Sequence, residues 1–444
     1  MSTLSSAPYK GSRDYYPADM RVQNYIFSQW RKMAQRYGYE EYGAPTLEPL
    51  EIYTAKSGQE LASEQTYTFT DRGERTVAIR PEMTPTISRM VAARRQEMAY
   101  PARLFSIANF MRYERPQRGR EREFWQLNAD IFGAEGSLAE AESITLGWRI
   151  MKSFGATEDM FIIRVNNRKL INRMMSDYLE LDAVQSQLMI RLFDRKEKIS
   201  HEDFRDQAID IFGSQASSGL PKIAALLTAK SISELPEAIR DMEEMAEVRK
   251  LFTELERVGI GNAIFDITLM RGFDYYTGTV FEFFDTHPDN RRAMFGGGRY
   301  DGLVGLFGAE PISAVGFAPG ATTTELFLRT HDLLPKLPST TEVYVVVLGN
   351  ARDGAMELTD KLREEGVNTE VDITGRKLDK QLKTAIKKDI PFILFVGEEE
   401  IKREVYPLKD TAKAEEQTMS FERVVSVVKD RRLRHDDDLD DLFE

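Results

Sequence analysis

Apolar and polar positions follow two different periods along the chain, and the changes of period mark its organisation. After Pro17, apolar residues recur at helical spacing, at Val22, Ile26, Trp30 and Met33. Residues 66–133 are mainly strand-like, with a helical stretch over 84–98, whereas residues 170–258 are mostly helical in pattern. Because strand-like sequence resumes over 264–284, we interpret residues 170–258 as a helical module inserted into a β-rich unit.

A different pattern begins near Thr341, after a proline-spaced linker. The continuous apolar run 343–348 predicts a strand that is buried on both faces. Helical and strand-like segments then alternate, over 352–365, 368–373, 379–388 and 392–396. This alternation predicts a small α/β domain with a mostly parallel sheet over 341–431. Acidic residues dominate the end of the chain, so we expect residues 432–444 to form a disordered tail.

The composition narrows the possible chemistry. The chain has 444 residues, four histidines and no cysteine, which excludes disulfides, a thiolate nucleophile and cysteine-based metal sites. The histidines lie far apart in sequence, so Ser-His-Asp and metal-hydrolase mechanisms are poor candidates, and we expect no metal site built by the protein. The length favours two or three domains.

The formal net charge of −12 is unevenly distributed. The tail 436–444 holds six of the acidic residues, which leaves −6 for the rest of the chain. Positive charge concentrates in a loop near 112–122 and along Arg376, Lys377, Lys380, Lys383, Lys387 and Lys388. The net charge therefore argues against an indiscriminate polyanion binder, but it allows a nucleic acid to bind at local sites.

The chain shows no targeting or membrane signal. Its first ten residues lack an apolar core with a basic flank, and no apolar run is long enough to span a bilayer. We therefore expect a cytoplasmic protein without membrane contact.

The most informative segment is an arginine-rich turn between two strand-like stretches. Its arginines surround Pro116 and Gly119, at Arg112, Arg115, Arg118, Arg120 and Arg122. Guanidinium forks bind phosphate oxygens, although the intervening glutamates also fit a solvated hairpin tip. In the strand that follows, Phe124, Gln126, Asn128 and Asp130 alternate with apolar residues. One polar face of this kind suits the floor of a pocket.

Three other segments are candidates with simpler alternatives. Glu82 and Thr84 precede or begin a helix, where helix capping is the simpler interpretation. Arg271 lies in an aromatic, β-like segment and needs a ligand or an ion pair with Asp274 or Glu282. The glycine run 296–301 lacks the phosphate-loop and dinucleotide-binding patterns, so on its own it is more typical of a flexible turn.

In this order the segments resemble the histidyl-tRNA synthetase family of class II aminoacyl-tRNA synthetases. Residues 11–14 and 39–49 resemble the opening and motif 1, and residues 110–133 resemble motif 2. Residues 271–282 and 296–302 are similar to the signatures of the histidine-specific members. Residues 314–320 resemble the start of motif 3, and residues 341–431 are similar to the anticodon-binding domain.

The resemblance implies a fold, a reaction and partners. The expected fold class is α+β, with an antiparallel-sheet catalytic domain over 1–333 that carries the helical insertion 170–258, and an α/β anticodon-binding domain over 341–431. The implied reaction is ATP-dependent activation of L-histidine to histidyl-adenylate, followed by transfer to the 3′ end of tRNA(His). Mg²⁺ and a homodimer are implied as well, with tRNA bound through the motif 2 loop and the C-terminal domain.

The resemblance also implies roles for individual residues. The catalytic residues would be Arg271 and Arg112. The histidine site would comprise Glu82, Thr84, Arg112, Gln126, Asp130, Arg271, Tyr275 and Tyr276. The ATP site would comprise Arg112, Glu114, Arg120 and Phe124.

One position departs from the family pattern. Thr323 stands where many members carry the motif 3 arginine that stacks over ATP, and a threonine cannot supply that charge. Either other groups such as Arg122 or Arg271 serve ATP in an active variant, or the chain is a catalytically silent regulator that senses histidine or uncharged tRNA. Because the other motif positions are intact, we expect an active ligase.

Overall fold

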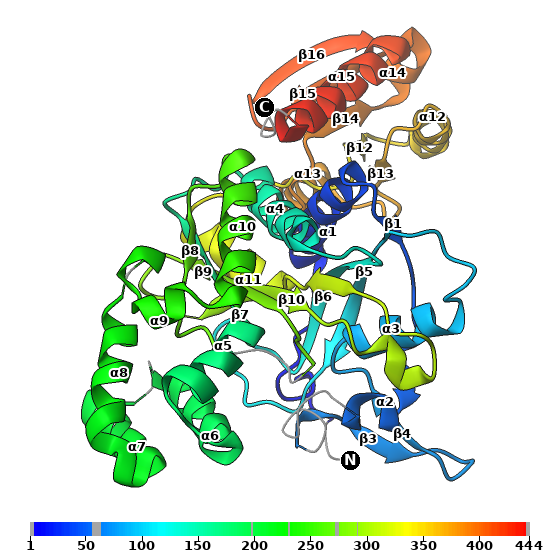
Figure 1. Cartoon of the computed structure of the whole chain (residues 1–444). Coiled ribbons are helices and arrows are strands. Elements are labelled where there is room, and N and C mark those ends of the chain that lie inside the picture. The colour runs from blue at the N-terminus through cyan, green and yellow to red at the C-terminus, as the bar shows by residue number, and fades with distance from the viewer. Residues whose placement is uncertain are drawn as a thin grey trace. The chain divides into compact units, whose positions relative to one another are not determined.

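The computed structural model describes residues 4–55, 64–196, 199–229, 231–270, 275–290 and 292–440, with side chains as far as residue 432. The chain divides into two compact units, residues 1–334 and 335–444 (Figure 1). Each unit has its own sheets and its own apolar core, and each is described by itself below.

The first unit is built on a large sheet of eight strands. Their spatial order is β1 (Glu40–Glu41), β5 (Ala102–Met111), β6 (Glu123–Phe132), β11 (Ala314–Phe317), β10 (Ala293–Arg299), β9 (Thr279–Asp285), β7 (Phe161–Asn167) and β8 (Ala263–Phe265). Neighbouring strands are antiparallel except for the pairs β1–β5 and β7–β8 at the two edges. The expected antiparallel catalytic sheet is therefore confirmed.

The β5–β6 hairpin is the longest pairing in this sheet. It runs from the pair Ala102–Phe132 to the pair Met111–Glu123 and ends at the arginine-rich turn. This is the hairpin that the alternating pattern predicted. Beside it lies a small sheet in the order β2 (Leu47–Pro49), β4 (Thr76–Ile79) and β3 (Thr68–Thr70), with the short helix α2 (Glu51–Thr54).

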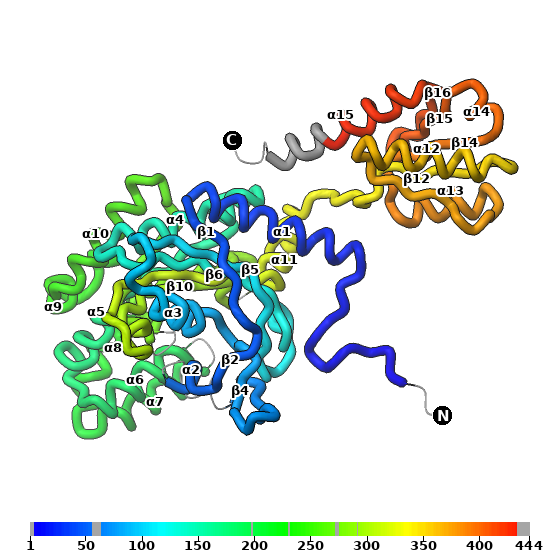
Figure 2. Tube along the Cα trace, turned by 90° about the vertical axis from the view of Figure 1, so that its right-hand side faces the viewer, coloured from blue at the N-terminus to red at the C-terminus, as the bar shows by residue number. Residues whose placement is uncertain are grey.

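Helices cover one face of the large sheet. The helices α1 (Pro17–Arg36), α4 (Ser137–Ser153) and α11 (Ala321–Thr330) pack against β6 and its neighbours (Figure 2). The ring of Phe27 on α1 lies 5.3 Å from that of Trp125 on β6. Because strand residues alternate between faces, Gln126 and Asp130 point to the opposite face. That face receives α3 (Thr84–Ala93), which ends earlier than the helix predicted over 84–98.

A helical segment separates β7 from β8, which pair in parallel on either side of it. It contains α5 (Arg168–Arg173), a π-helical turn (Met174–Tyr178), α6 (Ala183–Asp194), α7 (His201–Phe212), α8 (Ala216–Thr228), α9 (Glu237–Arg240) and α10 (Glu243–Arg257), with 3₁₀ turns over Gly213–Gln215 and Ile232–Glu234. Apolar side chains such as Met189, Phe193 and Leu226 form its own core. A further 3₁₀ turn, Val304–Phe307, follows β10.

The second unit has a five-stranded sheet in the order β13 (Thr369–Val371), β12 (Val343–Val347), β14 (Phe392–Val396), β15 (Val405–Asp410) and β16 (Glu415–Ser420). The pairs β12–β13 and β12–β14 are parallel, and the pairs formed by β15 are antiparallel. Its helices are α12 (Arg352–Glu364), α13 (Leu378–Lys387), α14 (Glu398–Arg403) and α15 (Phe421–Asp440) (Figure 2).

Helices lie on both faces of this second sheet, as the apolar run predicted. Val343 and Val345 belong to a core with Leu358 of α12, whereas Tyr344 belongs to a separate core with Ala385 of α13. Two expectations for this unit do not match the structure. Its sheet is mixed and not mostly parallel, with two parallel and two antiparallel strand pairs, because the β15–β16 hairpin joins β14 in the antiparallel direction. Helix α15 continues to Asp440, so residues 432–440 extend a helix that begins in the packed domain and do not form a disordered tail from residue 432.

Candidate active site

A cavity of about 1770 Å³ opens over the polar face of β6 in the first unit. Its lining combines residues from β6, the start of α3, the arginine-rich loop and the helical segment. Of the residues that the sequence proposed, it brings together Glu82, Thr84, Arg112, Glu114, Arg120, Gln126, Asp130, Tyr275 and Tyr276. Side chains almost 200 residues apart in sequence thus meet in one cavity.

Glycines give this cavity a flat floor. Gly296, Gly297 and Gly316 all line it. A Cβ at Gly297 would collide with the carbonyl of Gly316, and a Cβ at Gly298 would lie 2.8 Å from the ring of Tyr276. The run 296–299 therefore belongs to a central strand, and the interpretation as a flexible turn is wrong. Glycine is needed here because backbone and aromatic rings approach closely.

Asp130 is the buried carboxylate at the base of the cavity, with a relative exposure of 4%. The hydroxyl of Tyr300 donates a short hydrogen bond to its Oδ1. Burial raises the pKa of Asp130 to about 7, although the Tyr300 hydrogen bond acts in the opposite direction. Tyr300 lines the same cavity. No local pattern indicates this contact, because the two residues are 170 positions apart in the chain.

Glu82 lies across the cavity from β6. The hydroxyl of Tyr275 donates to its Oε2 over 2.9 Å, and Glu82 is 3% exposed. Burial raises the pKa of Tyr275 well above its ordinary value, which keeps this donor protonated. Helix α3 begins without a side-chain capping hydrogen bond. The capping interpretation of Glu82 and Thr84 is therefore wrong, and both side chains face the cavity instead.

Arginines enter from the hairpin side. Arg112 donates from Nε to the Pro81 carbonyl over 2.9 Å and lies 5.2 Å from the centre of the Phe124 ring. Arg120 pairs with Glu114 over 2.6 Å. Phe124 packs on Phe110 beneath Arg112 and does not itself line the cavity. The cavity wall at this end is thus formed by Arg112, Arg120 and Glu114.

Two other arginines were named from the sequence as candidates. Arg271, together with Asp274, lies outside the described residues. Arg122 points away from the cavity, since its guanidinium lies 4.2 Å from the centre of the Tyr113 ring and donates to the Tyr9 hydroxyl over 3.0 Å. It therefore does not replace the missing motif 3 charge at Thr323.

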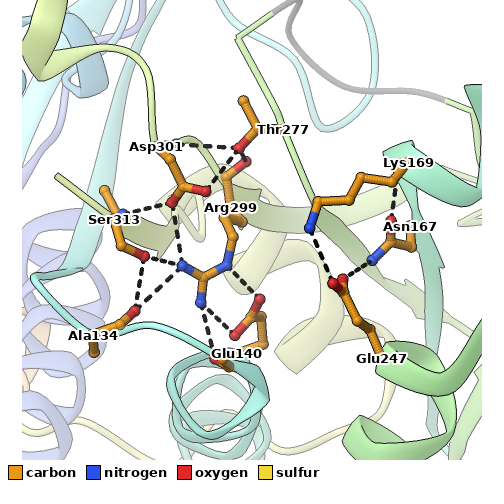
Figure 3. Close-up of polar contacts among 11 residues, drawn as sticks. Ala134, Glu140, Asn167, Lys169, Glu247, Thr277, Arg299, Asp301 and Ser313 are labelled. Carbon is orange, nitrogen blue, oxygen red and sulfur yellow. Dashed lines mark hydrogen bonds and ion pairs between the residues drawn. The ribbon is translucent and has the colours of Figure 1, made fainter. Parts of the chain in front are cut away.

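A buried ion pair fixes β10 beneath the site (Figure 3). Arg299 is 6% exposed and makes two hydrogen bonds of 2.6 Å to the carboxylate of Glu140 on α4. Its Nη1 also donates to Asp301 over 3.2 Å and to Ser313. Because Tyr300 lies between Arg299 and Asp301, this network holds the residue that bonds Asp130. The second cluster in Figure 3 ties β7 to α10, through Asn167, Lys169 and Glu247.

The antiparallel sheet, its arginine-bearing hairpin and the polar floor define the catalytic fold of class II aminoacyl-tRNA synthetases. The sequence profile of the histidyl-tRNA synthetase family matches residues 11–322, and that of the anticodon-binding domain matches residues 342–431. Because the first profile covers well over half of the chain, this protein belongs to the histidyl-tRNA synthetase family.

Individual relatives agree with this assignment. A histidine–tRNA ligase of Leptospira biflexa is 41% identical over 96% of this chain and 98% of its own length. One of Opitutus terrae is 37% identical over 97% of this chain and 99% of its own length. The crystal structure of histidyl-tRNA synthetase from Nostoc sp. PCC 7120 has the same fold, with a TM-score of 0.81 at 22% identity, covering 97% of this chain and all of that one.

Among the described residues, no helix is both long enough and apolar enough to cross a membrane.

Proposed function

We propose that this protein activates L-histidine with ATP and transfers the histidyl group to the 3′ end of tRNA(His). The observation that carries the proposal is one cavity in which two buried carboxylates, Glu82 and Asp130, face arginines from the hairpin. The family to which the chain belongs supports the same reaction.

The histidine substrate fits the polar end of the cavity. Its α-amino group would bind Glu82 and Thr84, and its imidazole would bind Asp130, with Gln126, Tyr275 and Tyr276 around the ring. The ionised form of Asp130 is the stronger acceptor for an imidazole N–H. The raised pKa makes the fraction of that form sensitive to pH near neutrality. An amino acid that lacks an imidazole would leave these buried polar groups without hydrogen-bond partners, and its binding would therefore be disfavoured.

ATP fits the arginine end. Arg112 would contact both the α-phosphate and the histidine carboxylate, Arg120 the γ-phosphate and Glu114 the adenine. The resemblance also implies stacking of Phe124 on the base, but Phe124 does not line the cavity in this structure. Arg120 and Glu114 bond each other over 2.6 Å in the structure. ATP binding would therefore exchange this ion pair for contacts with the nucleotide.

The chemistry needs no general base. The histidine carboxylate is already a nucleophile at neutral pH and attacks the α-phosphorus in line, which forms histidyl-adenylate and releases pyrophosphate. Charge that develops on the phosphoryl oxygens is stabilised by fixed guanidinium groups. We assign this role to Arg112 and, from the resemblance, to Arg271. A ribose hydroxyl of the tRNA then attacks the carbonyl carbon, and AMP leaves.

Mg²⁺ would enter with ATP. Within the described ranges no three histidine or carboxylate side chains are grouped to hold a metal ion. Mg²⁺ commonly takes most of its ligands from phosphate oxygens and water, with one or two carboxylates. Glu282 on β9 lines the cavity and would supply such a carboxylate. The ion would neutralise charge on the triphosphate.

tRNA would meet the protein at two places, the arginine-rich loop of motif 2 and the C-terminal unit. Basic residues of the second unit lie on α13 and directly beside its two ends, at Arg376, Lys377, Lys380, Lys383, Lys387 and Lys388. We further propose a cytoplasmic homodimer, because two-fold dimers are the commonest soluble assembly and the resemblance includes motif 1.

Histidine-dependent exchange of pyrophosphate into ATP tests the proposal against the alternative of a silent regulator. A ligase gives exchange with histidine and little with other amino acids. A regulator binds histidine and ATP without exchange, and Thr323 is the observation that favours it. The other residues of the cavity and the match to ligases along the whole chain favour the enzyme.

A further inference from the structure

Thr323 provides no cation to the cavity, and its surroundings show what its side chain does instead. It lies in the first turn of α11. Its hydroxyl donates to the Met294 carbonyl over 2.9 Å and to the Gly320 carbonyl over 3.0 Å. Thr323 therefore attaches the start of α11 to the start of β10. Any positive charge beside Thr323 must come from another residue.

Two nearby arginines are held by contacts elsewhere, Arg13 by ion pairs and Arg122 by neutral partners. Arg13 forms ion pairs with Glu325 over 2.7 Å and with Glu121 over 3.5 Å, so its charge is compensated. Arg122 packs on Tyr113 outside the cavity. Neither arginine places an uncompensated charge beside Thr323.

Arg292 differs from both. It directly precedes Ala293 and Met294, which line the cavity, and Met294 accepts the Thr323 hydrogen bond. Its Nη2 donates to Oε1 of Gln117 in the arginine-rich loop over 2.9 Å. Within the described part of the chain, Arg292 makes no ion pair, and its side chain is exposed. The neutral side-chain amide of Gln117 thus holds the guanidinium of Arg292 between the loop and the start of β10. This contact does not neutralise the positive charge of Arg292.

We propose that Arg292 binds the triphosphate of ATP and supplies the positive charge that Thr323 lacks. The inference rests on the proposed function, since it assumes that ATP occupies the arginine end of the cavity. A guanidinium can bind two phosphate oxygens at once, and contact with a charged group is stronger than contact with Gln117. In this chain the charge then comes from the residue directly before β10 instead of from α11.

The test compares variants in histidine-dependent ATP–pyrophosphate exchange. Arg292→Ala should raise the KM for ATP by about tenfold or more, the loss expected for a charge-assisted hydrogen bond, with little change in the KM for histidine. Gln117→Ala should have a much smaller effect, because it removes only the neutral partner. Arg249→Ala, which removes an exposed arginine from α10, is the matched control and should behave as wild type.

A second variant separates the charge from the stability of the loop. Thr323→Arg should restore the KM for ATP when combined with Arg292→Ala, because it returns the cation from α11. The inference is overturned if Arg292→Ala leaves the KM for ATP unchanged in an enzyme that is otherwise active, or if Gln117→Ala is equally harmful. Absence of exchange in the wild type would instead contradict the proposed function itself.

Discussion

The raised pKa of Asp130 leads to the most specific prediction, for the variant Asp130→Asn. The carboxyl is buried and accepts a hydrogen bond from the hydroxyl of Tyr300. A side chain at Gly316 would collide with it, so Asp130 is closely enclosed. Burial thus favours the protonated acid, whereas the ionised carboxylate is the stronger acceptor for an imidazole N–H.

The raised pKa of Asp130 changes the free energy of unfolding with pH, in a direction and by an amount that follow from the shift. The pKa rises from 3.8 to about 7 on folding, so the folded state holds the proton more tightly between these values. Stability from this group is fully present below the unfolded pKa and is lost as the pH rises through about 7. The shift corresponds to about 4 kcal/mol. Asparagine does not titrate, so Asp130→Asn should gain stability relative to wild type as the pH rises.

Denaturant unfolding of the wild type and of Asp130→Asn between about pH 4 and pH 8 measures the difference in their free energies of unfolding. Contributions from other titrating groups cancel, because both proteins contain those groups. A difference in unfolding free energy that stays flat across this range would show that folding does not raise the pKa of Asp130.

Activity gives an independent measurement on the same variant. Loss of a hydrogen bond to a charged group should raise the KM for histidine by about tenfold to a hundredfold, with the KM for ATP nearly unchanged. Asp285→Asn is a matched control, because Asp285 is a buried carboxylate outside the cavity that bonds Asn290 and His331. An unchanged KM for histidine in Asp130→Asn would exclude Asp130 from the binding site.

Three further predictions concern other parts of the account. Arg271→Ala should lower exchange by roughly two orders of magnitude or more, as for a lost oxyanion donor, and near-wild-type exchange would remove Arg271 from the reaction. Deletion of the residues after Pro338 should spare exchange but abolish tRNA charging, since the first unit ends at Leu334; a truncated protein that still charges tRNA normally would contradict the role of the second unit. Glu140→Gln should lower the free energy of unfolding by about 3 kcal/mol or more, because it leaves Arg299 buried without its counter-charge, and a denaturation curve that matches wild type would contradict this.

Local patterns were enough to predict the parts of the site that form within one hairpin or one strand. The alternation at Gln126, Asn128 and Asp130 correctly placed these polar side chains on the face that lines the cavity, because strand periodicity is a property of consecutive residues. The apolar run that begins at Val343 predicted a strand with helices on both sides for the same reason.

Contacts between distant residues could not be predicted this way. Glu82 looked like a helix cap until the fold brought Tyr275 to it, 193 positions along the chain. The role of Tyr300, which follows the run of glycines, was not predicted. Only the packed sheet shows that the glycines leave room for aromatic rings and that Tyr300 forms a hydrogen bond with Asp130. The continuation of α15 through an acidic sequence was missed because composition alone favours disorder there.

The most direct test of the central claim is charging of tRNA by the purified full-length protein. With ATP, Mg²⁺, tRNA(His) and the amino acids in turn, we predict that histidine alone becomes attached to the tRNA 3′ end and that one AMP forms for each histidine transferred. Binding of histidine and ATP without formation of AMP or histidyl-tRNA would contradict the account and leave a sensor in place of a ligase.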